Sequence, residues 1–228
     1  MTPILIVDDN AVNRLALEAL LRPLAVPFVL ADGGASAVVA FERAEFSLVL
    51  IDLVMPVVDG FEAARRMRAH EFGSGRRTPI VAVTALDADA VRARCLAVGI
   101  DDVAGKPIDR AVIVAQIEKW TGEHVAGDRG APEDVGKLVD TFLVVTRKLL
   151  AEIDVALATH DEPRVRRAVH ELRGAALQMN APEIARLCRE LDAAEHEDEM
   201  LAVYASLAHA FARVKSHETK MKSVWSTT

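Results

Sequence analysis

The stretch LVLIDLVMPVVDG at residues 48–60 decides how the first half of the chain folds. Its first four residues, Leu48–Ile51, are all apolar, and the run stops at Asp52, with Pro56 and Gly60 close behind. A short apolar run bounded by charged and turn-forming residues is typical of a strand that is buried on both faces of a parallel sheet. Asp52 then lies at the carboxyl end of this strand.

Short apolar runs of the same kind occur on both sides of this stretch. They are Ile4–Val7, Pro27–Leu30, Ile80–Val83 and Asp102–Ala104. Helix patterns separate them, with Asn10 and Asp109 placed as N-caps and Gly99 as a helix-ending residue. Strands that alternate with helices imply right-handed crossovers and a parallel sheet covered on both faces. We therefore predict a doubly wound α/β domain with a five-stranded parallel sheet over residues 1–121.

The second half of the chain shows only helical periodicity. Four apolar stripes at helical spacing follow one another after Pro132, and they begin at Val135, Val165, Ile184 and Met200. Four helices joined by short turns are typical of an antiparallel bundle, which we predict over residues 132–217. The glycine-containing residues 122–131 are interpreted as a flexible linker, and residues 218–228 as a polar tail.

The composition excludes several classes of protein. The chain has 228 residues, 51% of them hydrophobic and 27% charged, which excludes a disordered chain. A net charge of −7 makes nucleic acid a poor partner, because binding to phosphates needs a cationic face. No apolar run approaches the roughly 18 residues of a membrane span. We expect no signal peptide, because the apolar run Ile4–Val7 is short and ends at two aspartates. We expect a cytoplasmic protein that binds neither nucleic acid nor membranes, and its oligomeric state stays open.

Charged side chains follow several of the predicted strands. Asp8 and Asp9 end the first strand, Asp52 the third and Thr84 the fourth, and Lys106 follows the fifth. These ends converge if the first strand lies between the second and the third. Three carboxylates in one pocket repel one another unless a cation is present, and oxygen ligands favour Mg²⁺. Asp52 could then attack a phosphoryl group whose oxygens Lys106 and Thr84 neutralise and orient. The plainer alternative is that the aspartates cap helices and that one of them pairs with Lys106.

Residues 1–121 resemble a response-regulator receiver domain of two-component signalling. The matching segments are VDDN at 7–10, LVLIDLVMPVVDG at 48–60, VTA at 83–85 and GIDDVAGKP at 99–107. The resemblance implies a flavodoxin-like fold in which Asp52 is the phosphoacceptor.

The same resemblance implies roles for the neighbours of Asp52. Asp9 would bind Mg²⁺ directly, Asp8 would bind it through water, and the backbone carbonyl of Val54 would supply a further ligand. Thr84 and Lys106 would contact the phosphoryl group, and Pro107 falls on a cis-proline position of the family. The sequence departs from the family at Val103, where an aromatic switch residue is usual, so a large rearrangement of the output face is in doubt.

His170 differs from the other histidines of the chain in its surroundings. Arg173 and Gly174 follow it at helical spacing, so the three residues share one surface of the predicted helix. A neutral imidazole keeps a lone pair that can attack phosphorus, and Arg173 would bind the phosphoryl oxygens. The alternative is an ordinary solvated histidine beside an arginine.

The stretch HELRGAALQMNAPEIARLCRELDAA at 170–194 resembles a histidine phosphotransfer (Hpt) domain. The resemblance makes His170 the phosphohistidine. Arg173 stands where the family usually has lysine, and Asn180 stands where glycine commonly breaks the helix. Arginine keeps the positive charge and asparagine tolerates the left-handed turn, so neither change removes the expected function.

Together the two halves predict a phosphorelay protein. An upstream histidine kinase would phosphorylate Asp52, and His170 would carry phosphate to or from partner receivers. The sequence contains no ATP-binding kinase motif, so we expect a phosphotransfer signalling protein, not an enzyme that phosphorylates itself from ATP. Two alternatives remain open: an interaction module that binds a kinase or receiver without passing phosphate, and a C-terminal piece of a hybrid histidine kinase.

Overall fold

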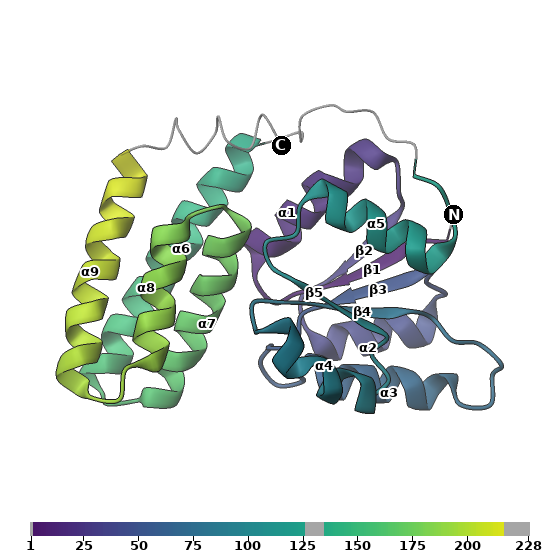
Figure 1. The fold of residues 1–228 in the computed structure, drawn as a ribbon, viewed down its shortest axis with the longest axis horizontal. Helices are drawn as coiled ribbons and strands as arrows, with labels where there is room; N and C mark the ends of the chain where they lie inside the picture. The colour runs from purple at the N-terminus through teal and green to yellow at the C-terminus, as the bar shows by residue number, and fades with distance from the viewer. Residues whose placement is uncertain (1, 126–134, 217–228) are drawn as a thin grey trace. The chain divides into compact units, whose positions relative to one another are not determined.

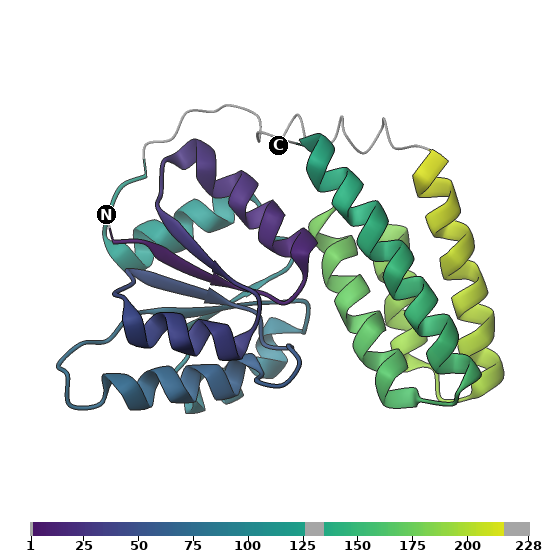
Figure 2. The same ribbon diagram turned by 180° about the vertical axis from the view of Figure 1, so that it is seen from behind.

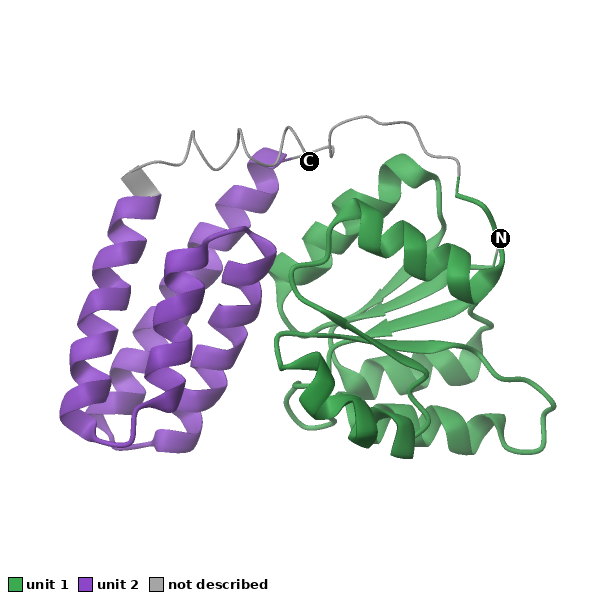
Figure 3. Ribbon diagram, viewed as in Figure 1, with its two compact units in different colours: residues 1–133, 228 green, residues 134–227 purple. Residues whose placement is uncertain are grey.

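The computed structural model describes residues 2–125 and 135–216. The chain divides into two compact units, residues 1–133 and residues 134–227, which are coloured separately in Figure 3. The expected tail at 218–228 and most of the expected linker at 122–131 lie outside the described residues. Of the helices in the described ranges, none combines the length and the apolar character that a bilayer crossing requires.

The first unit contains a parallel sheet of five strands in the order β2-β1-β3-β4-β5, which confirms the expected fold. The strands are β1 (Ile4–Val7), β2 (Phe28–Ala31), β3 (Leu48–Ile51), β4 (Ile80–Thr84) and β5 (Asp102–Gly105). Val7 is paired with Ile51 across β1 and β3, so Asp8 and Asp52 leave the sheet side by side. The second strand lies one residue later than expected, since Pro27 has no N–H to donate and contributes only its carbonyl, to Ile4 N at 2.9 Å. β4 and β5 each extend one residue further than expected, to Thr84 and Gly105.

Helices cover both faces of this sheet. They are α1 (Ala11–Leu21), α2 (Gly34–Arg43), α3 (Gly60–Glu71), α4 (Ala88–Ala97) and α5 (Arg110–Thr121), with a 3₁₀ turn at Arg22–Leu24. Figures 1 and 2 show α1 and α5 on one face and α2, α3 and α4 on the other. Side chains alternate along the strands into two apolar cores, so that Leu5 and Val7 pack towards α3 while Ile4 and Ile6 pack towards α1.

Side-chain caps fix where these helices begin. Asn10 accepts a hydrogen bond from Val12 N, and Asp109 accepts one from Val112 N, as their positions in the sequence predict. The apolar pattern of α1 predicts Val12, Leu15 and Ala19 on its inward face. In the structure Leu15 is only half-buried, while Leu17 is buried, so the inward face is broader.

The second unit consists of four helices in the described range, which also confirms the expected fold. They are α6 (Val135–Ala158), α7 (Glu162–Gln178), α8 (Pro182–Ala193) and α9 (Glu197–Ser216). Asn180, two residues after the end of α7, has a φ of 51°, the left-handed conformation that asparagine tolerates. The expected stripes form its core, with Phe142, Val169 and Leu191 all completely buried.

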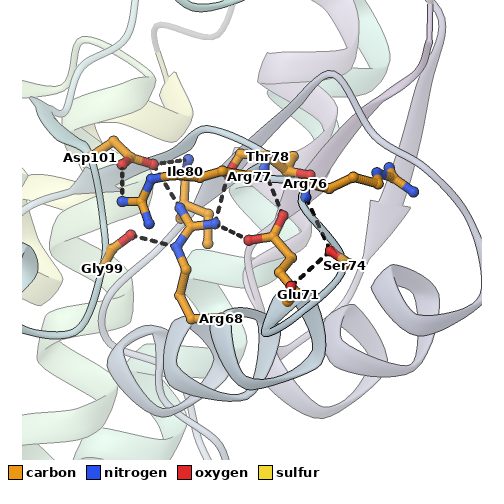
Figure 4. Close-up of polar contacts among 9 residues, drawn as sticks. All are labelled: Arg68, Glu71, Ser74, Arg76, Arg77, Thr78, Ile80, Gly99 and Asp101. Carbon is orange, nitrogen blue, oxygen red and sulfur yellow. Dashed lines mark hydrogen bonds and ion pairs between the residues drawn. The ribbon is translucent and has the colours of Figure 1, made fainter.

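A buried ion-pair network fixes the amino-terminal edge of the sheet in the first unit (Figure 4). Arg68 on α3 donates to Glu71 at 2.5 Å and to Asp101 at 2.7 Å. It also donates to the carbonyls of Gly99 and Thr78, each at 2.8 Å. One guanidinium therefore joins the end of α3 to the segments that lead into β4 and β5.

The sequence of residues 73–77 is typical of a flexible, locally basic connector and does not indicate whether Arg76 and Arg77 have partners, which the structure provides. Arg77 donates to Asp101 at 2.5 Å, and Arg76 donates to Glu45 at 2.5 Å. Ser74 donates to the carbonyl of Glu71 at 2.7 Å. The connector is held by ion pairs with carboxylates that lie far from it in the sequence, which local composition does not reveal.

Cys95 and Cys188 are both buried and free, which is typical of cysteines that pack as small core residues. Burial raises the pKa of the Cys188 thiol to about 12, even though Arg173 lies near enough to oppose the rise. Neither cysteine belongs to a candidate site.

Candidate functional site

The ammonium group of Lys106 lies between two carboxylates at the carboxyl end of the sheet. Its Nζ is 2.8 Å from Oδ2 of Asp8 and 2.5 Å from Oδ2 of Asp52. The three side chains are almost completely buried, with exposed fractions of 1% for Lys106, 2% for Asp8 and 6% for Asp52. They come from three different strand ends, so the convergence expected from the sequence is present.

Burial and mutual charge set the ionisation of this cluster. Burial raises the pKa of Asp8, and the nearby charge of Asp52 adds to the rise while Lys106 opposes it. Burial alone would lower the pKa of Lys106, but Asp52 and Asp8 together raise it above its usual value. Lys106 is therefore a permanent cation facing two carboxylates, and the buried cluster has an excess of negative charge when both are ionised.

Residues of the first helix orient Asp8, and sequence reasoning did not assign them. Oδ1 of Asp8 accepts from Asn10 N at 2.9 Å and from Asn13 Nδ2 at 3.1 Å. Its carbonyl accepts from Arg14 Nη1 at 2.6 Å. All of these residues lie in the run DDNAVNR at 8–14. Their spacing places them around Asp8 only once the turn into α1 has formed, so the sequence alone does not show that they contact it.

The other expected residues of this site lie around the cluster. Thr84 is completely buried at the end of β4, and its carbonyl accepts from Lys106 N at 2.8 Å. Val54 N donates to Oδ1 of Asp52 at 3.2 Å, which fixes the second oxygen of that carboxylate. Asp9 is half-buried next to Asp8. The peptide bond between Lys106 and Pro107 is cis, as the resemblance implied.

The donor set suits a hard divalent cation. Asp8 and Asp52 present carboxylate oxygens in a buried pocket where one ammonium does not balance their charge. As they stand, no three histidine, cysteine, aspartate or glutamate side chains within residues 2–125 and 135–216 form a group that could hold a metal ion. Asp9 and the Val54 carbonyl would therefore have to complete the coordination together with water.

Val103 occupies the position where the resemblance expects an aromatic ring. It lies on β5 with an exposed fraction of 7%, packed into the core between the sheet and α3. A buried valine has no ring that could move between an inward and an outward position. Val103 therefore departs from the family pattern both in residue type and in how it packs, because it stays buried in the core.

His170 and Arg173 lie one turn apart on α7, and both are half-buried. Arg173 approaches a carboxylate on the neighbouring helix α8, because its Nη1 is 3.9 Å from Oδ2 of Asp192. Arg166 approaches the other oxygen of Asp192 at 3.8 Å and also donates to its backbone carbonyl. Asp192 thus lies between two guanidinium groups of the helix that carries His170, a position that the sequence alone does not indicate.

Replacing Asp192 with asparagine is expected to slow phosphorylation of His170 about threefold to tenfold, because Arg173 would lose the charge that fixes its position. The pair is partly exposed, so stability should change by at most about 1 kcal/mol. The measurement is the rate of phosphohistidine formation with phosphoramidate, followed by intact mass. Glu190→Gln, which removes an exposed α8 partner of Arg186, is the control and should leave the rate unchanged. Equal rates for all three proteins would show that Asp192 does not position Arg173.

Comparisons with known proteins agree with these observations. A family model described as the response regulator receiver domain matches residues 4–118, and a model described as the Hpt domain matches residues 137–217. The sensor protein GacS of Pseudomonas syringae pv. syringae is 31% identical over 233 residues, which cover 87% of this chain and 26% of GacS. The virulence sensor protein BvgS of Bordetella bronchiseptica is 30% identical over 172 residues, covering 74% of this chain and 14% of BvgS.

A solved structure also matches the first unit. It is the receiver domain of a sensor histidine kinase from Pseudomonas aeruginosa PAO1, described with a magnesium ion coordinated in its active-site cleft. That domain is 38% identical, and the match covers 54% of this chain and 98% of that chain with a TM-score of 0.49.

Proposed function

Because the chain belongs to the response regulator receiver domain family and carries an Hpt domain after it, we propose that it is a phosphorelay intermediate. The receiver, residues 1–121, takes a phosphoryl group onto Asp52 from the phosphohistidine of an upstream kinase. The phosphotransfer module, residues 132–217, carries phosphate on His170 to or from a receiver. The observation that carries the proposal is the buried Lys106 ammonium held between Asp8 and Asp52.

The uptake step is a substitution at phosphorus. An Oδ atom of Asp52 forms a bond to phosphorus while the bond from phosphorus to the imidazole nitrogen of the donor breaks, and the electron pair of that bond returns to the ring. Charge on the equatorial phosphoryl oxygens needs a fixed cation and a hydrogen-bond donor. Lys106 supplies the first, and the hydroxyl of Thr84 at the end of β4 supplies the second. Transfer to His170 is the reverse exchange of an oxygen for a ring nitrogen.

A bound Mg²⁺ would neutralise phosphoryl oxygens and draw them towards the carboxylates. Asp8, Asp9, Asp52 and the Val54 carbonyl are the groups of this chain that would hold it. The excess of buried carboxylate over ammonium supports this assignment.

The alternative of an interaction module that passes no phosphate is not favoured. Such a module needs no nucleophile beside a buried cation, and a switch built on Val103 lacks the aromatic ring that signals phosphorylation in the family. The expected partners are an upstream histidine kinase and partner receivers. The chain spans only 26% of GacS and 14% of BvgS, so it corresponds to a small part of each of these proteins.

The proposal is tested by loading the full chain with acetyl phosphate and Mg²⁺ and reading intact mass and bond lability. Asp52 gives an acyl phosphate that alkali cleaves, and His170 gives a phosphoramidate that acid cleaves and alkali spares. Asp52→Asn is expected to abolish uptake, and His170→Gln is expected to remove only the acid-labile, alkali-stable fraction. EDTA should reduce uptake at least tenfold.

Asp102→Asn is the matched control, because it removes an aspartate at the opposite end of the sheet, where Asp102 pairs with Lys119 and Arg92. It should load like the unsubstituted chain. Uptake that survives in Asp52→Asn would refute the assignment of the phosphoacceptor. Phosphate that never reaches His170 from Asp52 would exclude transfer within the chain and leave His170 dependent on another receiver.

A further inference from the structure

Asn13 is a buried polar residue on the first turn of α1, next to the candidate site. It is 2% exposed, and its Nδ2 donates to Oδ1 of Asp8 at 3.1 Å. Its Oδ1 is also buried, but it accepts no hydrogen bond from any group within residues 2–125 and 135–216. A buried side-chain oxygen normally has a donor, because leaving it unpaired costs free energy. The structure therefore places an unused acceptor beside the carboxylate of Asp8.

The contact with Asp8 fixes which way the amide of Asn13 points. If the amide were turned over, its oxygen would face a carboxylate oxygen at the 3.1 Å that now separates Nδ2 from it. Both atoms are acceptors, so they would repel each other and Asp8 would lose a donor. Asp8 itself is held in place, because Asn10 N donates to its Oδ1 at 2.9 Å and Lys106 donates to its Oδ2 at 2.8 Å. The amide nitrogen therefore stays on Asp8, and the amide oxygen stays available as an acceptor.

A cation bound in this pocket would bring the missing donor with it. Within the parts of the chain that the structure describes, no three acidic, histidine or cysteine side chains form a group that could hold a metal ion. Water therefore has to complete the coordination of Mg²⁺, which keeps several water molecules in most protein sites. A metal-bound water is a strong donor with two protons, and in a buried pocket each proton needs an acceptor. Asp8 can accept one of these protons, and a second acceptor has to lie close by.

We propose that Asn13 is a positioning residue of the cation site. Its Nδ2 fixes the carboxylate of Asp8, and its Oδ1 accepts a hydrogen bond from a water molecule on the bound Mg²⁺. This inference rests on the proposed function, in which Asp8 binds the cation through water. One planar amide thus contacts both the carboxylate and the water that joins it to the metal. Residues that orient a metal ligand in this way typically change metal affinity about tenfold to 100-fold when they are replaced.

The experiment measures metal affinity in the full-length chain with Mn²⁺ as the probe, from the electron paramagnetic resonance signal of the unbound ion. Mn²⁺ takes the same oxygen ligands as Mg²⁺. Asn13→Leu removes both ends of the amide at nearly the same volume, and its dissociation constant should be about tenfold higher than that of the parent. Gln116→Leu is the matched control, because it removes an amide on α5 that accepts from Trp120 Nε1 at 3.1 Å, and it should leave the affinity unchanged. The Asp8→Asn chain shows how much Mn²⁺ binds outside this site.

Asn13→Asp separates the two ends of the amide. When ionised it keeps an acceptor oxygen but has no proton to donate to Asp8. It should bind Mn²⁺ at least as tightly as the parent, because the water keeps its acceptor and the pocket gains a negative charge. If Asn13→Asp instead bound Mn²⁺ as weakly as Asn13→Leu, the contact between Nδ2 and Asp8 would explain the whole effect, and the assignment of Oδ1 to a metal-bound water would be wrong.

Two further measurements separate this role from a purely structural one. In EDTA the urea midpoint of Asn13→Leu, followed by circular dichroism, should match that of the parent, because the substitution removes an unpaired buried oxygen together with one hydrogen bond. In loading with acetyl phosphate, the Mg²⁺ concentration for half-maximal uptake should rise about tenfold. The uptake rate at saturating Mg²⁺ should stay within about twofold of the parent, because the phosphoacceptor and Lys106 are unchanged.

Three results would overturn the inference. The first is an unchanged Mn²⁺ affinity in Asn13→Leu and in Asn13→Ala, a second variant without the amide. The second is a lower urea midpoint in EDTA with an unchanged Mg²⁺ requirement, which would make Asn13 structural only. The third is a slower uptake that saturating Mg²⁺ does not restore, which would place Asn13 at the phosphoryl group. If Asp52 of the parent took up no phosphate, the proposed function would fail, and the Mn²⁺ affinities would still show separately whether Asn13 acts at the cation.

Discussion

Replacing Lys106 with methionine is expected to lower the free energy of unfolding by about 3 kcal/mol in EDTA, because the carboxylates of Asp8 and Asp52 would stay buried without a cation. Mg²⁺ should restore part of this loss, since binding to the folded state stabilises it. Uptake of phosphate from acetyl phosphate should nevertheless fall at least about 100-fold with Mg²⁺ present, because a divalent ion does not replace the ammonium at the phosphoryl oxygens.

The stability of the first unit can be followed through Trp120 on α5, using a Trp225→Phe background so that only this tryptophan remains. Urea unfolding would be recorded in EDTA and in Mg²⁺ for the parent and the Lys106→Met chain. Arg92→Met, which removes a 45% exposed partner of Asp102, is the control and should cost no more than about 1 kcal/mol.

A double substitution separates the charge effect from lost packing. In an Asp52→Asn background only Asp8 needs the cation, so Lys106→Met should cost less there than in the parent chain. Equal costs in both backgrounds would show that Asp52 and Lys106 are not coupled. Unchanged stability of Lys106→Met in EDTA would show that the cluster does not depend on the ammonium.

The sheet and the centre of its site could be predicted from the sequence, because both follow from periodicity. Apolar runs such as Leu48–Ile51 identify buried strands, and a parallel sheet gathers the residues after its strands at one edge. Asp8, Asp52 and Lys106 are therefore brought together by topology alone. The helical stripes of the second half predict the bundle in the same way.

Features that depend on particular side-chain or backbone conformations could not be predicted in this way. Many surface carboxylates follow α7, and nothing in the spacing singles out Asp192 as the one beside Arg173. The positive φ of Val57, which lies in the loop between β3 and α3, reflects the packing of Gly60 and Gly34 on either side of this turn, whereas valine itself favours extended backbone. The sequence leaves the contacts of Arg77 open, because its partner, Asp101, lies beyond β4.

Replacing Arg68 with methionine is expected to lower the free energy of unfolding of the first unit by about 3–5 kcal/mol. Its side chain is 14% exposed, and its partners Glu71 and Asp101 are 8% and 11% exposed, so water cannot replace the lost guanidinium. Asp101 also accepts from Ile80 N at 2.8 Å, and Glu71 accepts from Thr78 N at 2.6 Å, so neither carboxylate can turn away without breaking a backbone contact. Two buried negative charges would then face each other.

The network lies at the end of the sheet opposite Asp52, which lets stability and function be measured separately. Urea unfolding of Arg68→Met, followed through Trp120, should show the loss, while acetyl phosphate loading of the folded fraction should match the parent. Arg77→Met removes the 61% exposed partner of the same Asp101 and should cost no more than about 1 kcal/mol. If both arginines cost the same, burial would not be what makes Arg68 matter. Among the hydrogen bonds and ion pairs described for residues 2–125, no side-chain contact joins the Arg68 network to the Asp52 cluster. If loading of the folded fraction nevertheless fell in Arg68→Met, the amino-terminal edge of the sheet would be coupled to the phosphoacceptor through the sheet itself.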